Sequence, residues 1–275
     1  MGSQALNDTE QYRRTMLRTV GIGKRFGSLV ALDDISFDIP RHSIVSVIGP
    51  NGAGKTVFFN ILTGLLKPDT GTVWFNGKDI TGLAPDRISA LGISRTFQNI
   101  RLFANMTVLE NVLVGRHAHL QAGIWGTVFR TRAMVDEEAR ATHDALEVLE
   151  FAGLGGMAQQ TAKNLPYGAG RRLEIARALA TNPQLLLLDE PTAGMNPQET
   201  AEMIDMVQRL QRETGLTILL IEHDMKVVMR ISDRITVLDS GVKIAEGKPE
   251  EVRAEARVIE AYLGRGAAYG EARSF

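Results

Sequence analysis

The sequence Gly49-Pro50-Asn51-Gly52-Ala53-Gly54-Lys55-Thr56 matches the phosphate-binding pattern G-x-x-x-x-G-K-[ST]. The apolar segment before it, residues 43–48, is expected to form a buried strand. The segment after it, residues 57–66, has the length and apolar content of a helix. This order of strand, loop and helix predicts an α/β fold built around a P-loop nucleotide-binding core.

The loop has the chemistry that a triphosphate requires. Its glycines allow successive backbone N–H groups to point inward, and the positive end of the following helix adds to their field. Lys55 is expected to reach the β- and γ-phosphates, and the Thr56 hydroxyl to contact Mg²⁺. The alternative is a glycine-rich turn that carries a surface lysine, which the strand and helix on either side make less probable than a nucleotide site.

Composition limits the classes of function. The chain has 275 residues, with 31 Lys and Arg against 32 Asp and Glu, so it lacks the overall positive charge of most nucleic-acid-binding proteins. No apolar run reaches the roughly 18 to 20 residues that span a bilayer, and residues 1–8 do not read as a signal peptide. With no cysteine in the chain, we expect a cytoplasmic protein without disulfides or thiolate metal sites.

Two further apolar runs end in polar residues. Residues 185–188 precede Asp189 and Glu190, and residues 217–221 precede Glu222 and His223. Continuous aliphatic runs are typical of a parallel sheet covered on both faces, whose ligands bind beyond the carboxyl ends of its strands. We therefore expect the phosphate loop and both polar ends to meet at one edge of the sheet.

These polar residues suit hydrolysis of a γ-phosphate. Asp189 could bind Mg²⁺ directly or through water, and Glu190 could polarise the attacking water. His223 could contact the γ-phosphate and orient the same water. Without the nearby loop, Asp189 would be interpreted as an exposed turn carboxylate and His223 as a structural histidine.

The segments around this core have different periodicities. Residues 16–20 and 35–39 alternate as antiparallel strands do, and Asn76-Gly77 after residues 72–75 indicates a hairpin that extends the same sheet. Residues 107–154 are predominantly helical, because Thr107 and Glu110 form a capping box and Gly153 suits a helix end. Apolar residues at helical spacing continue this pattern at Ala141, Ala145, Val148, Leu149 and Ala152.

Two local features leave more than one interpretation open. The apolar cluster Ile124, Trp125, Val128 and Phe129 could contact a membrane subunit or pack within the helical region, which is the commoner case. His117 and His119 have the spacing of a metal pair but no third ligand, so we interpret them as solvated or capping residues. No metal other than Mg²⁺ is expected.

One more segment connects these motifs. Residues 165–179 read Leu-Pro-Tyr-Gly-Ala-Gly-Arg-Arg-Leu-Glu-Ile-Ala-Arg-Ala-Leu, which resembles the signature segment of ABC transporter ATPases. Arg95-Thr96-Phe97-Gln98 resembles the Q-loop of that family, and residues 193–196 its D-loop. Residues 95–103, 167–177 and 221–226 are most similar to the ATPases of branched-chain amino acid importers.

The resemblance implies a division of the chain and a set of site residues. It implies a flexible leader at 1–14, a first part of a RecA-like ATP-binding core with an antiparallel β subdomain at 15–98, and an inserted α-helical subdomain at 99–164. The signature helix and second part of the core follow at 165–250, and a C-terminal helix and tail at 251–275. The implied catalytic residues are Glu190, His223, Gln98 and Lys55; those binding ATP are Phe26, Gly49, Pro50, Asn51, Gly52, Ala53, Gly54, Lys55, Thr56, Val57, Gln98, Asp189 and His223, with Tyr167 and Gly168 in trans; those binding Mg²⁺ are Thr56, Gln98 and Asp189.

The same resemblance implies the mechanism and partners. Phe26 would stack on adenine, although alone it would be interpreted equally well as a loop hydrophobe. ATP would lie between the phosphate loop of one subunit and the signature of a second, identical or homologous ATPase. Two membrane permease subunits would anchor the pair at the cytoplasmic face of the inner membrane, and a periplasmic or extracellular binding protein would act indirectly. No nucleic acid is expected as a partner.

Several residues depart from the family pattern. Val57 stands where a hydroxyl residue is common, and losing one hydrogen bond of about 0.5–1.5 kcal/mol would weaken nucleotide binding several-fold. Pro166 and Tyr167 replace Ser-Gly, and Ala169 replaces a glutamine, which removes donors to the nucleotide in trans. Gly170 in the helix costs up to about 1 kcal/mol relative to alanine. These departures predict an active but slow ATPase.

Three other functions were weighed against amino-acid import. An ABC ATPase of another system, such as other amino-acid, urea-type or lipid transport, would share the same motifs. A regulatory subunit that binds nucleotide without hydrolysis would fit Val57 and Ala169 but not the intact Asp189, Glu190 and His223. A soluble ATP-dependent switch on nucleic acid or ribosomes would be expected to carry two cassettes or a basic arm, and this chain has neither.

Overall fold

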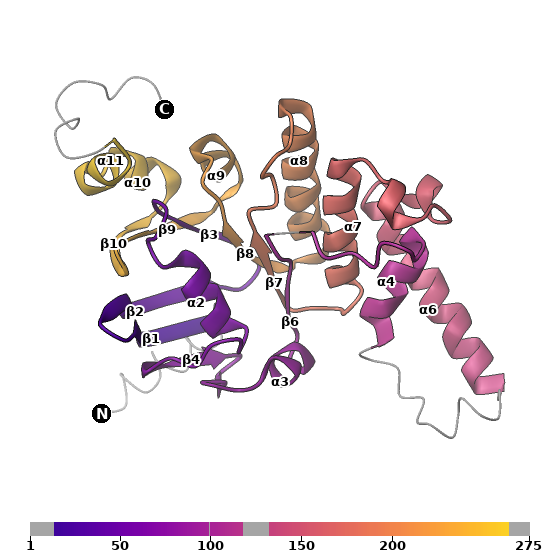
Figure 1. Ribbon diagram of the computed structural model, residues 1–275, viewed down its shortest axis with the longest axis horizontal. Coiled ribbons are helices and arrows are strands. Elements are labelled where there is room, and N and C mark those ends of the chain that lie inside the picture. Colours follow the sequence, from indigo (N-terminus) through magenta and orange to yellow (C-terminus); the bar gives the residue numbers. More distant parts are fainter. Residues whose placement is uncertain (1–13, 99, 118–131, 264–275) are drawn as a thin grey trace. The chain divides into compact units, whose positions relative to one another are not determined.

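The computed structural model describes residues 14–98, 100–117 and 132–263 (Figure 1). The expected leader before Arg14, the cluster at Ile124 to Phe129, His119 and the C-terminal tail after residue 263 lie outside these residues. The strands are β1 (Thr15–Phe26), β2 (Leu29–Pro40), β3 (Ile44–Ile48), β4 (Thr70–Phe75), β5 (Lys78–Asp79), β6 (Ile93–Arg95), β7 (Leu185–Asp189), β8 (Thr217–Ile221), β9 (Arg234–Asp239) and β10 (Val242–Gly247). The helices are α2 (Lys55–Leu62), α3 (Pro85–Ala90), α4 (Val108–His117), α6 (Arg132–Phe151), α7 (Tyr167–Leu179), α8 (Pro197–Thr214), α9 (Met225–Ile231), α10 (Pro249–Ala254) and α11 (Ala256–Leu263), with 3-10 turns η1 (Gly155–Met157) and η2 (Ala162–Asn164).

The chain packs as two units. The first contains residues 1–93, 184–190 and 207–275, and the second contains residues 94–183 and 191–206. The second unit therefore includes α7 as well as the helical insert, while β6 and α8 pass from one unit to the other. The functional segments that the sequence suggests at 15–98, 99–164 and 165–250 remain a prediction, because they were drawn from motifs rather than from packing.

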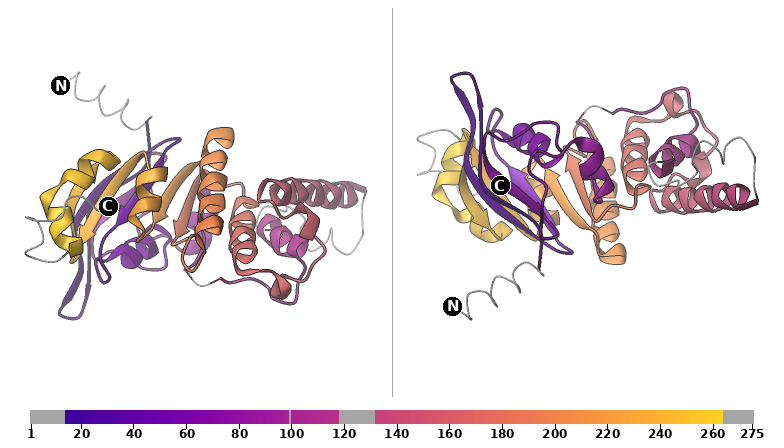
Figure 2. Two further views of the ribbon diagram at one scale, coloured as in Figure 1. Left: turned by 90° about the horizontal axis from the view of Figure 1, so that it is seen from above. Right: turned by 90° about the horizontal axis from the view of Figure 1, so that it is seen from below.

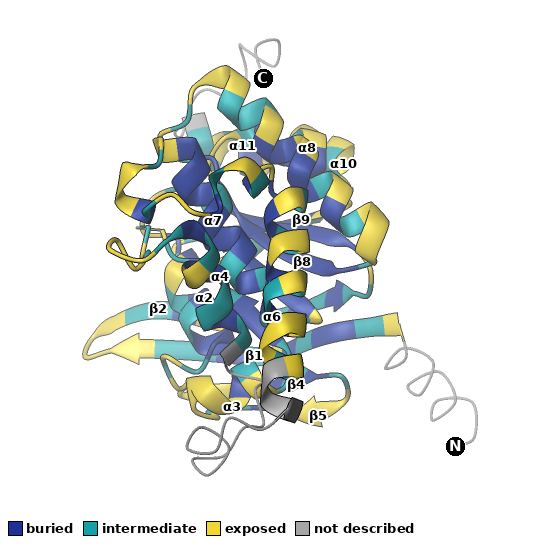
Figure 3. Ribbon diagram, turned by 90° about the vertical axis from the view of Figure 1, so that its right-hand side faces the viewer, coloured by how far each residue is buried: buried dark blue, intermediate teal, exposed yellow. Residues whose placement is uncertain are grey.

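A six-stranded sheet has the order β10-β9-β3-β8-β7-β6. The strands β3, β8 and β7 are parallel neighbours, and every residue of each is buried, as their aliphatic sequences predict (Figure 3). Val47 pairs with Ile221, which pairs with Asp189, so the three strands end in one row. The predicted common edge is confirmed.

A second sheet is antiparallel, with the order β2-β1-β4-β5. The predicted strands at 16–20 and 35–39 are confirmed and are longer than expected, because pairing continues through the irregularities of β1 to Phe26 and Leu29. Asn76 and Gly77 have φ angles of 51° and 74°, which confirms the predicted hairpin between β4 and β5.

The helix after the phosphate loop differs from its predicted bounds of 57–66. It begins at Lys55, directly after Gly54, whose φ of 98° turns the chain into the helix. It ends at Leu62, because Gly64 adopts a φ of 73° and a Cβ there would lie 2.3 Å from the Leu83 carbonyl oxygen. The predicted end was wrong because the apolar residues beyond Gly64 were counted as helical.

The core of the first unit joins the two sheets through this helix. Phe58 of α2 packs edge-on against Phe37 of β2, with ring centroids 5.7 Å apart. The same buried cluster contains Leu187 of β7 and Leu219 of β8. Seen from above and below in Figure 2, the yellow helices α10 and α11 overlap the indigo strands β1 and β2. The strand β10, which contacts β2 as well as both helices, lies between them (Figure 1). This packing holds α2, and with it the end of the phosphate loop, against strands of both sheets.

The helices of the second unit begin and end as predicted. The Thr107 hydroxyl accepts from the Glu110 N–H at 3.1 Å, and the Glu110 carboxylate accepts from the Thr107 N–H at 2.7 Å. This reciprocal pair is the predicted capping box of α4. The apolar stripe of α6 is buried at Ala141, Ala145 and Leu149, and Gly153 ends the segment with a φ of 68°.

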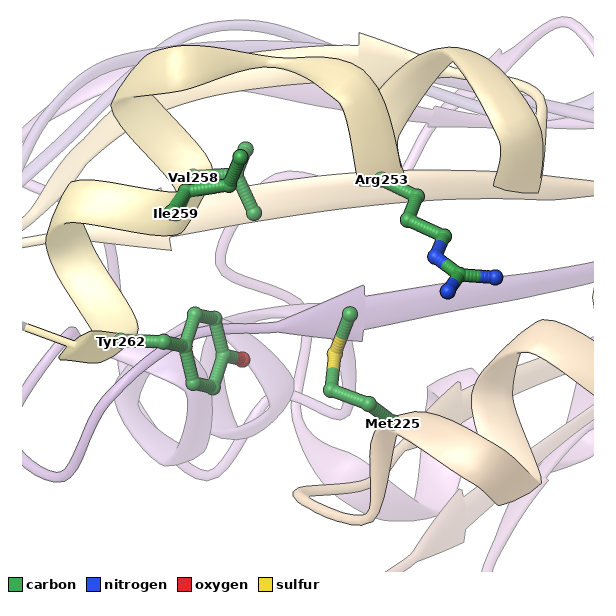
Figure 4. A pocket seen from close by; sticks show the side chains of 5 residues that line it. All are labelled: Met225, Arg253, Val258, Ile259 and Tyr262. Atoms are coloured by element: carbon green, nitrogen blue, oxygen red, sulfur yellow. The ribbon is translucent and has the colours of Figure 1, made fainter. Parts of the chain in front are cut away.

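The C-terminal part of the first unit was less apparent in the sequence. The strands β9 and β10 form a hairpin across Ser240-Gly241, and α10 and α11 pack on it. Figure 4 shows that side chains of Met225, Val258, Ile259 and Tyr262 face a small cleft between α9 and α11, with Arg253 at its side. Burial raises the pKa of the Tyr262 hydroxyl to about 12. Within the described ranges, no helix has the length and apolarity needed to cross a bilayer.

Candidate nucleotide-binding and hydrolysis site

The phosphate loop is formed where only glycine fits. A Cβ atom on Gly49 would lie 2.1 Å from the Leu238 carbonyl oxygen, and one on Gly54 would lie 2.6 Å from the Ala31 carbonyl oxygen. Gly52 and Gly54 also have left-handed φ angles of 83° and 98°. The backbone therefore follows β9 and β2 closely while its turn opens toward the N-terminus of α2.

Lys55 lies inside this loop. Its ammonium group donates hydrogen bonds to the carbonyl oxygens of Gly49 at 2.7 Å and Pro50 at 3.0 Å, and the residue is 8% exposed. Burial lowers the pKa of Lys55, and the nearby negative charges of Glu190 and Asp189 partly oppose that shift. The loop thus contains a largely buried cation close to the Asp189 and Glu190 carboxylates.

The carboxylates and the histidine converge at the ends of β7 and β8. Asp189 is 3% exposed, and the N–H of Glu190 donates to the Ile221 carbonyl oxygen at 2.9 Å. The Nδ1 atom of His223 lies 4.0 Å from Oε2 of Glu190 and 3.8 Å from Oε2 of the buried Glu222. The structure therefore brings Lys55, Asp189, Glu190 and His223 together, as the sequence predicted.

The backbone sets the positions from which the side chains of Glu190 and His223 extend. Glu190 has a φ of 48°, a left-handed conformation that non-glycine residues seldom adopt and that often marks a functional position. His223 directly precedes Asp224, whose carboxylate caps α9 by accepting from the Lys226 N–H at 2.8 Å. The imidazole is 58% exposed and can therefore reach a ligand without moving α9.

The oxygen atoms near the loop suit a divalent cation. Thr56 is exposed in the first turn of α2, so its hydroxyl is accessible, and the Asp189 carboxylate lies at the end of β7 in the same unit. Hydroxyl and carboxylate oxygens are the ligands that Mg²⁺ prefers. Across the described ranges, no group of three or more His, Cys, Asp or Glu side chains is placed to hold another metal. The side chain of His117 and all of His119 lie outside those ranges.

Phe26 lies at the end of β1, in the same unit as the phosphate loop. It is 46% exposed, and the Lys24 ammonium lies 5.6 Å from the centre of its ring. An exposed ring at the end of a strand pair is available for stacking on a base. Its role with adenine remains a prediction.

The remaining predicted site residues belong to the second unit. Gln98 is exposed, Tyr167 is 45% exposed at the start of α7, and Gly168 is buried. The Tyr167 hydroxyl donates a hydrogen bond to the Ala193 carbonyl oxygen of its own chain at 2.8 Å. Ala169 is buried, at 3% exposed. Contacts of Gln98, Tyr167 and Gly168 with ATP remain predictions.

Gly170→Ala is expected to stabilise the protein. A Cβ at this position would meet only the Cδ1 atoms of Ile100 at 3.6 Å and Leu102 at 3.8 Å, which is ordinary van der Waals contact. Alanine is favoured over glycine in a helix by about 1 kcal/mol. Thermal denaturation should show a melting temperature higher by about 2–4 °C.

Gly168→Ala is the matched control for that substitution. Its Cβ would lie 2.8 Å from Oε1 of Glu199, whose carboxylate accepts from the Asn196 N–H and caps α8. We therefore expect a smaller increase in melting temperature than for Gly170→Ala, because the Glu199 carboxylate must shift and its cap is weakened. Equal effects of the two substitutions would contradict the packing described for α7.

Two buried charged residues of the second unit were not predicted from the sequence. Arg171 and Glu174, on α7, are 4% and 2% exposed and form an ion pair of 3.5 Å. The sequence did contain a signal for this ion pair, because residues three apart on a helix are neighbours on its surface. Burial raises the pKa of Glu174, against hydrogen bonds from the N–H groups of Phe97 and Arg101 and the charges of Arg171 and Arg177.

Comparisons with known proteins agree with this geometry. Residues 32–193 match the ABC transporter family, and residues 242–268 match the branched-chain amino acid ATP-binding cassette transporter family. The chain is 47% identical to the high-affinity branched-chain amino acid transport ATP-binding protein LivG of Salmonella typhimurium, over 90% of this chain and 98% of that relative.

Two solved structures are also similar. The ADP conformation of MJ1267, an ATP-binding cassette of an ABC transporter, has a TM-score of 0.80 at 36% identity, covering 91% of this chain and 99% of that one. The dimeric structure of MJ0796, a bacterial ABC transporter cassette, has a TM-score of 0.72 at 28% identity, covering 85% and 99%. The predicted P-loop α/β fold is confirmed, and the chain belongs to the ATP-binding proteins of ABC transporters, among those of branched-chain amino acid transport.

Proposed function

We propose that this chain is the ATP-hydrolysing subunit of a branched-chain amino acid importer. The observation that carries the proposal is the convergence of Lys55, Asp189, Glu190 and His223 at one sheet edge. The similarity to LivG over nearly its whole length supports the choice of cargo, because it includes the C-terminal segment as well as the nucleotide site.

The phosphate loop would hold ATP through its backbone and Lys55. The ammonium group, which now donates to Gly49 and Pro50, has donors to offer to the β- and γ-phosphate oxygens. Thr56 and Asp189 would hold Mg²⁺, and Gln98 would complete the set. When bound, this ion would neutralise charge on the phosphate oxygens and orient them.

Glu190 and His223 would act on the attacking water. Phosphoryl transfer depends mainly on positioning the reacting groups and on stabilising charge. The group that activates the water therefore needs to be held in a fixed position. Glu190 is held by its turn and its N–H bond to Ile221, and its carboxylate would accept a proton of the water. His223, 4.0 Å away, would orient the same water and contact the γ-phosphate.

A second ATPase subunit, identical or homologous, would complete each site. Tyr167 and Gly168 of that subunit would face the γ-phosphate bound by this chain, and the dimeric cassette structure among the similar proteins supports such pairing. Two membrane permease subunits would bind the pair at the cytoplasmic face of the inner membrane. A substrate-binding protein would deliver the amino acid to the permeases and not to this chain.

A strain that lacks this protein is expected to lose most high-affinity leucine uptake. The proposed subunit supplies the energy for import, and without it the permeases cannot concentrate their cargo. Uptake of radiolabelled leucine measures the effect, and the wild-type chain should restore it while Glu190→Gln should not. Leucine uptake at the full rate in the deletion strain, with loss of another solute's uptake, would assign the same ATPase to a different cargo.

A further inference from the structure

Arg171 forms an unusual set of hydrogen bonds within the second unit. Its guanidinium donates from Nη1 to the Phe97 carbonyl oxygen at 3.0 Å and from Nη2 to the Gln98 carbonyl oxygen. It also donates to the Tyr167 hydroxyl, from Nε at 3.3 Å and from Nη2 at 3.2 Å. One buried side chain thus joins the backbone of the predicted Q-loop to the first residue of α7.

Glu174 strengthens the link to the Q-loop. Its Oε1 accepts from the Phe97 N–H at 3.3 Å, and its Oε2 lies 3.5 Å from Nη1 of Arg171. Both backbone groups of Phe97 are therefore bound by side chains that lie one helical turn apart on α7. Because both side chains are almost fully buried, this ion pair is shielded from solvent, and removal of Arg171 would leave the buried Glu174 with the charge of Arg177 but without its ion-pair partner.

Tyr167 extends the network to the predicted D-loop. A phenol has one proton to donate and lone pairs to accept. Arg171 can only donate, so the Tyr167 proton goes to the Ala193 carbonyl oxygen, 2.8 Å away. Gly194, with a φ of 77°, would place a Cβ only 3.3 Å from the same hydroxyl. The D-loop thus packs closely on the tyrosine that Arg171 holds.

We propose that Arg171 is a positioning residue for ATP hydrolysis, because it locks the Q-loop backbone, the signature tyrosine and the D-loop carbonyl into one arrangement. It acts through Gln98 and Tyr167 and needs no contact with ATP itself. All of these groups belong to the second unit, so their relative positions are set within it. The proposal rests on the ATPase activity of the chain and is independent of its cargo.

The planar fork of arginine explains the residue type. Its donors point in fixed, divergent directions and can serve two carbonyl oxygens and a hydroxyl together. A lysine at this position carries one ammonium group and could serve only part of the set. Glutamine would remove the charge that faces Glu174 and most of the donors.

The test compares Arg171→Gln, Arg171→Lys and Tyr167→Phe with the exposed control Arg209→Gln, in the complex with its membrane subunits. We expect Arg171→Gln to lower kcat for ATP hydrolysis by about 10- to 100-fold, since small misplacements of remote groups cost this much. The KM for ATP should change less than about two-fold, because the phosphate loop is untouched, and Arg171→Lys should restore part of kcat. Tyr167→Phe, which deletes one oxygen, should lower kcat less, and the double variant should match Arg171→Gln alone.

Four results would overturn the proposal. A kcat of Arg171→Gln within two-fold of wild type would show that Arg171 does not position the groups for hydrolysis. A loss of activity fully explained by weaker ATP binding would show the same. Additive losses in the double variant would show that Tyr167 and Arg171 act separately. Tyr167→Phe keeps the test decisive if Arg171→Gln unfolds, because phenylalanine retains the ring and removes only the hydrogen bonds of the hydroxyl with Ala193 and Arg171, and thermal melting shows whether this variant is folded. An unchanged kcat in that folded variant would also refute the proposal.

Discussion

Glu190→Gln is expected to lower ATP turnover by about 100- to 10,000-fold, the contribution typical of a positioned general base. The amide has the size and shape of the carboxylate but cannot accept a proton from water. The N–H of residue 190 would still donate to Ile221, so the turn with its φ of 48° is retained. ATP binding should remain, because the loop and Lys55 are unchanged and a negative charge next to the phosphates is removed.

Steady-state phosphate release by the purified chain measures the turnover, and binding of a fluorescent ATP analogue measures the affinity. Glu213→Gln, an exposed residue on α8 that pairs with Arg209, is the matched control and should retain wild-type values. Turnover by Glu190→Gln at more than about a tenth of the wild-type rate would show that another group serves as the base.

Lys55→Ala is expected to weaken ATP binding by about 10- to 150-fold, because a hydrogen bond to a charged group contributes about 1.5–3 kcal/mol. Lys55 is the cation enclosed by the loop, and its donors would pass from the carbonyl oxygens of Gly49 and Pro50 to phosphate oxygens. The fold should be retained, because alanine suits the first residue of α2.

Isothermal titration with ATP and Mg²⁺ would measure the loss. Lys78→Ala, at an exposed position of β5, removes an equal charge from the same unit and should leave the affinity unchanged. Equal weakening in the two variants would mean that general charge, and not the loop, controls binding. An unchanged affinity in Lys55→Ala would remove this lysine from the phosphate site.

The parallel core could be predicted because its signals are local. Predominantly apolar runs formed β3, β7 and β8, and the polar residues after them converged because parallel strands end at one edge. The positions of Asp189, Glu190 and His223 followed from that rule alone. The hairpin at Asn76-Gly77 could be predicted equally well, since the turn needs positive φ angles that few other residue pairs adopt.

Features that depend on tertiary packing could not be predicted from the sequence. The end of α2 is set by the approach of Gly64 to the Leu83 carbonyl, and nothing in the local periodicity shows that contact. The β9–β10 hairpin and the packing of α10 and α11 depend on partners elsewhere in the chain.

Within the candidate site, the hydrogen bonds of the second unit are the clearest example of contacts that the sequence did not predict. The contact of Tyr167 with a nucleotide in trans stays a prediction, and the hydrogen bond from its hydroxyl to Ala193 of its own chain was not predicted from the sequence. In the sequence, Arg171 is only one residue of the signature motif, although its side chain reaches residues more than 70 positions earlier in the chain. Such long-range hydrogen bonds leave no periodic trace in a sequence, so only the structure shows them.

Leucine accumulation in proteoliposomes that contain the whole transporter, measured together with phosphate release, tests the proposed function most directly. With the binding protein and leucine outside and ATP at the side of this chain, the proposal predicts that leucine accumulates only when ATP is supplied. Glu190→Gln should lower both leucine accumulation and phosphate release. Accumulation of leucine without ATP, or at an unchanged rate with Glu190→Gln, would contradict the proposal that hydrolysis at this site drives import.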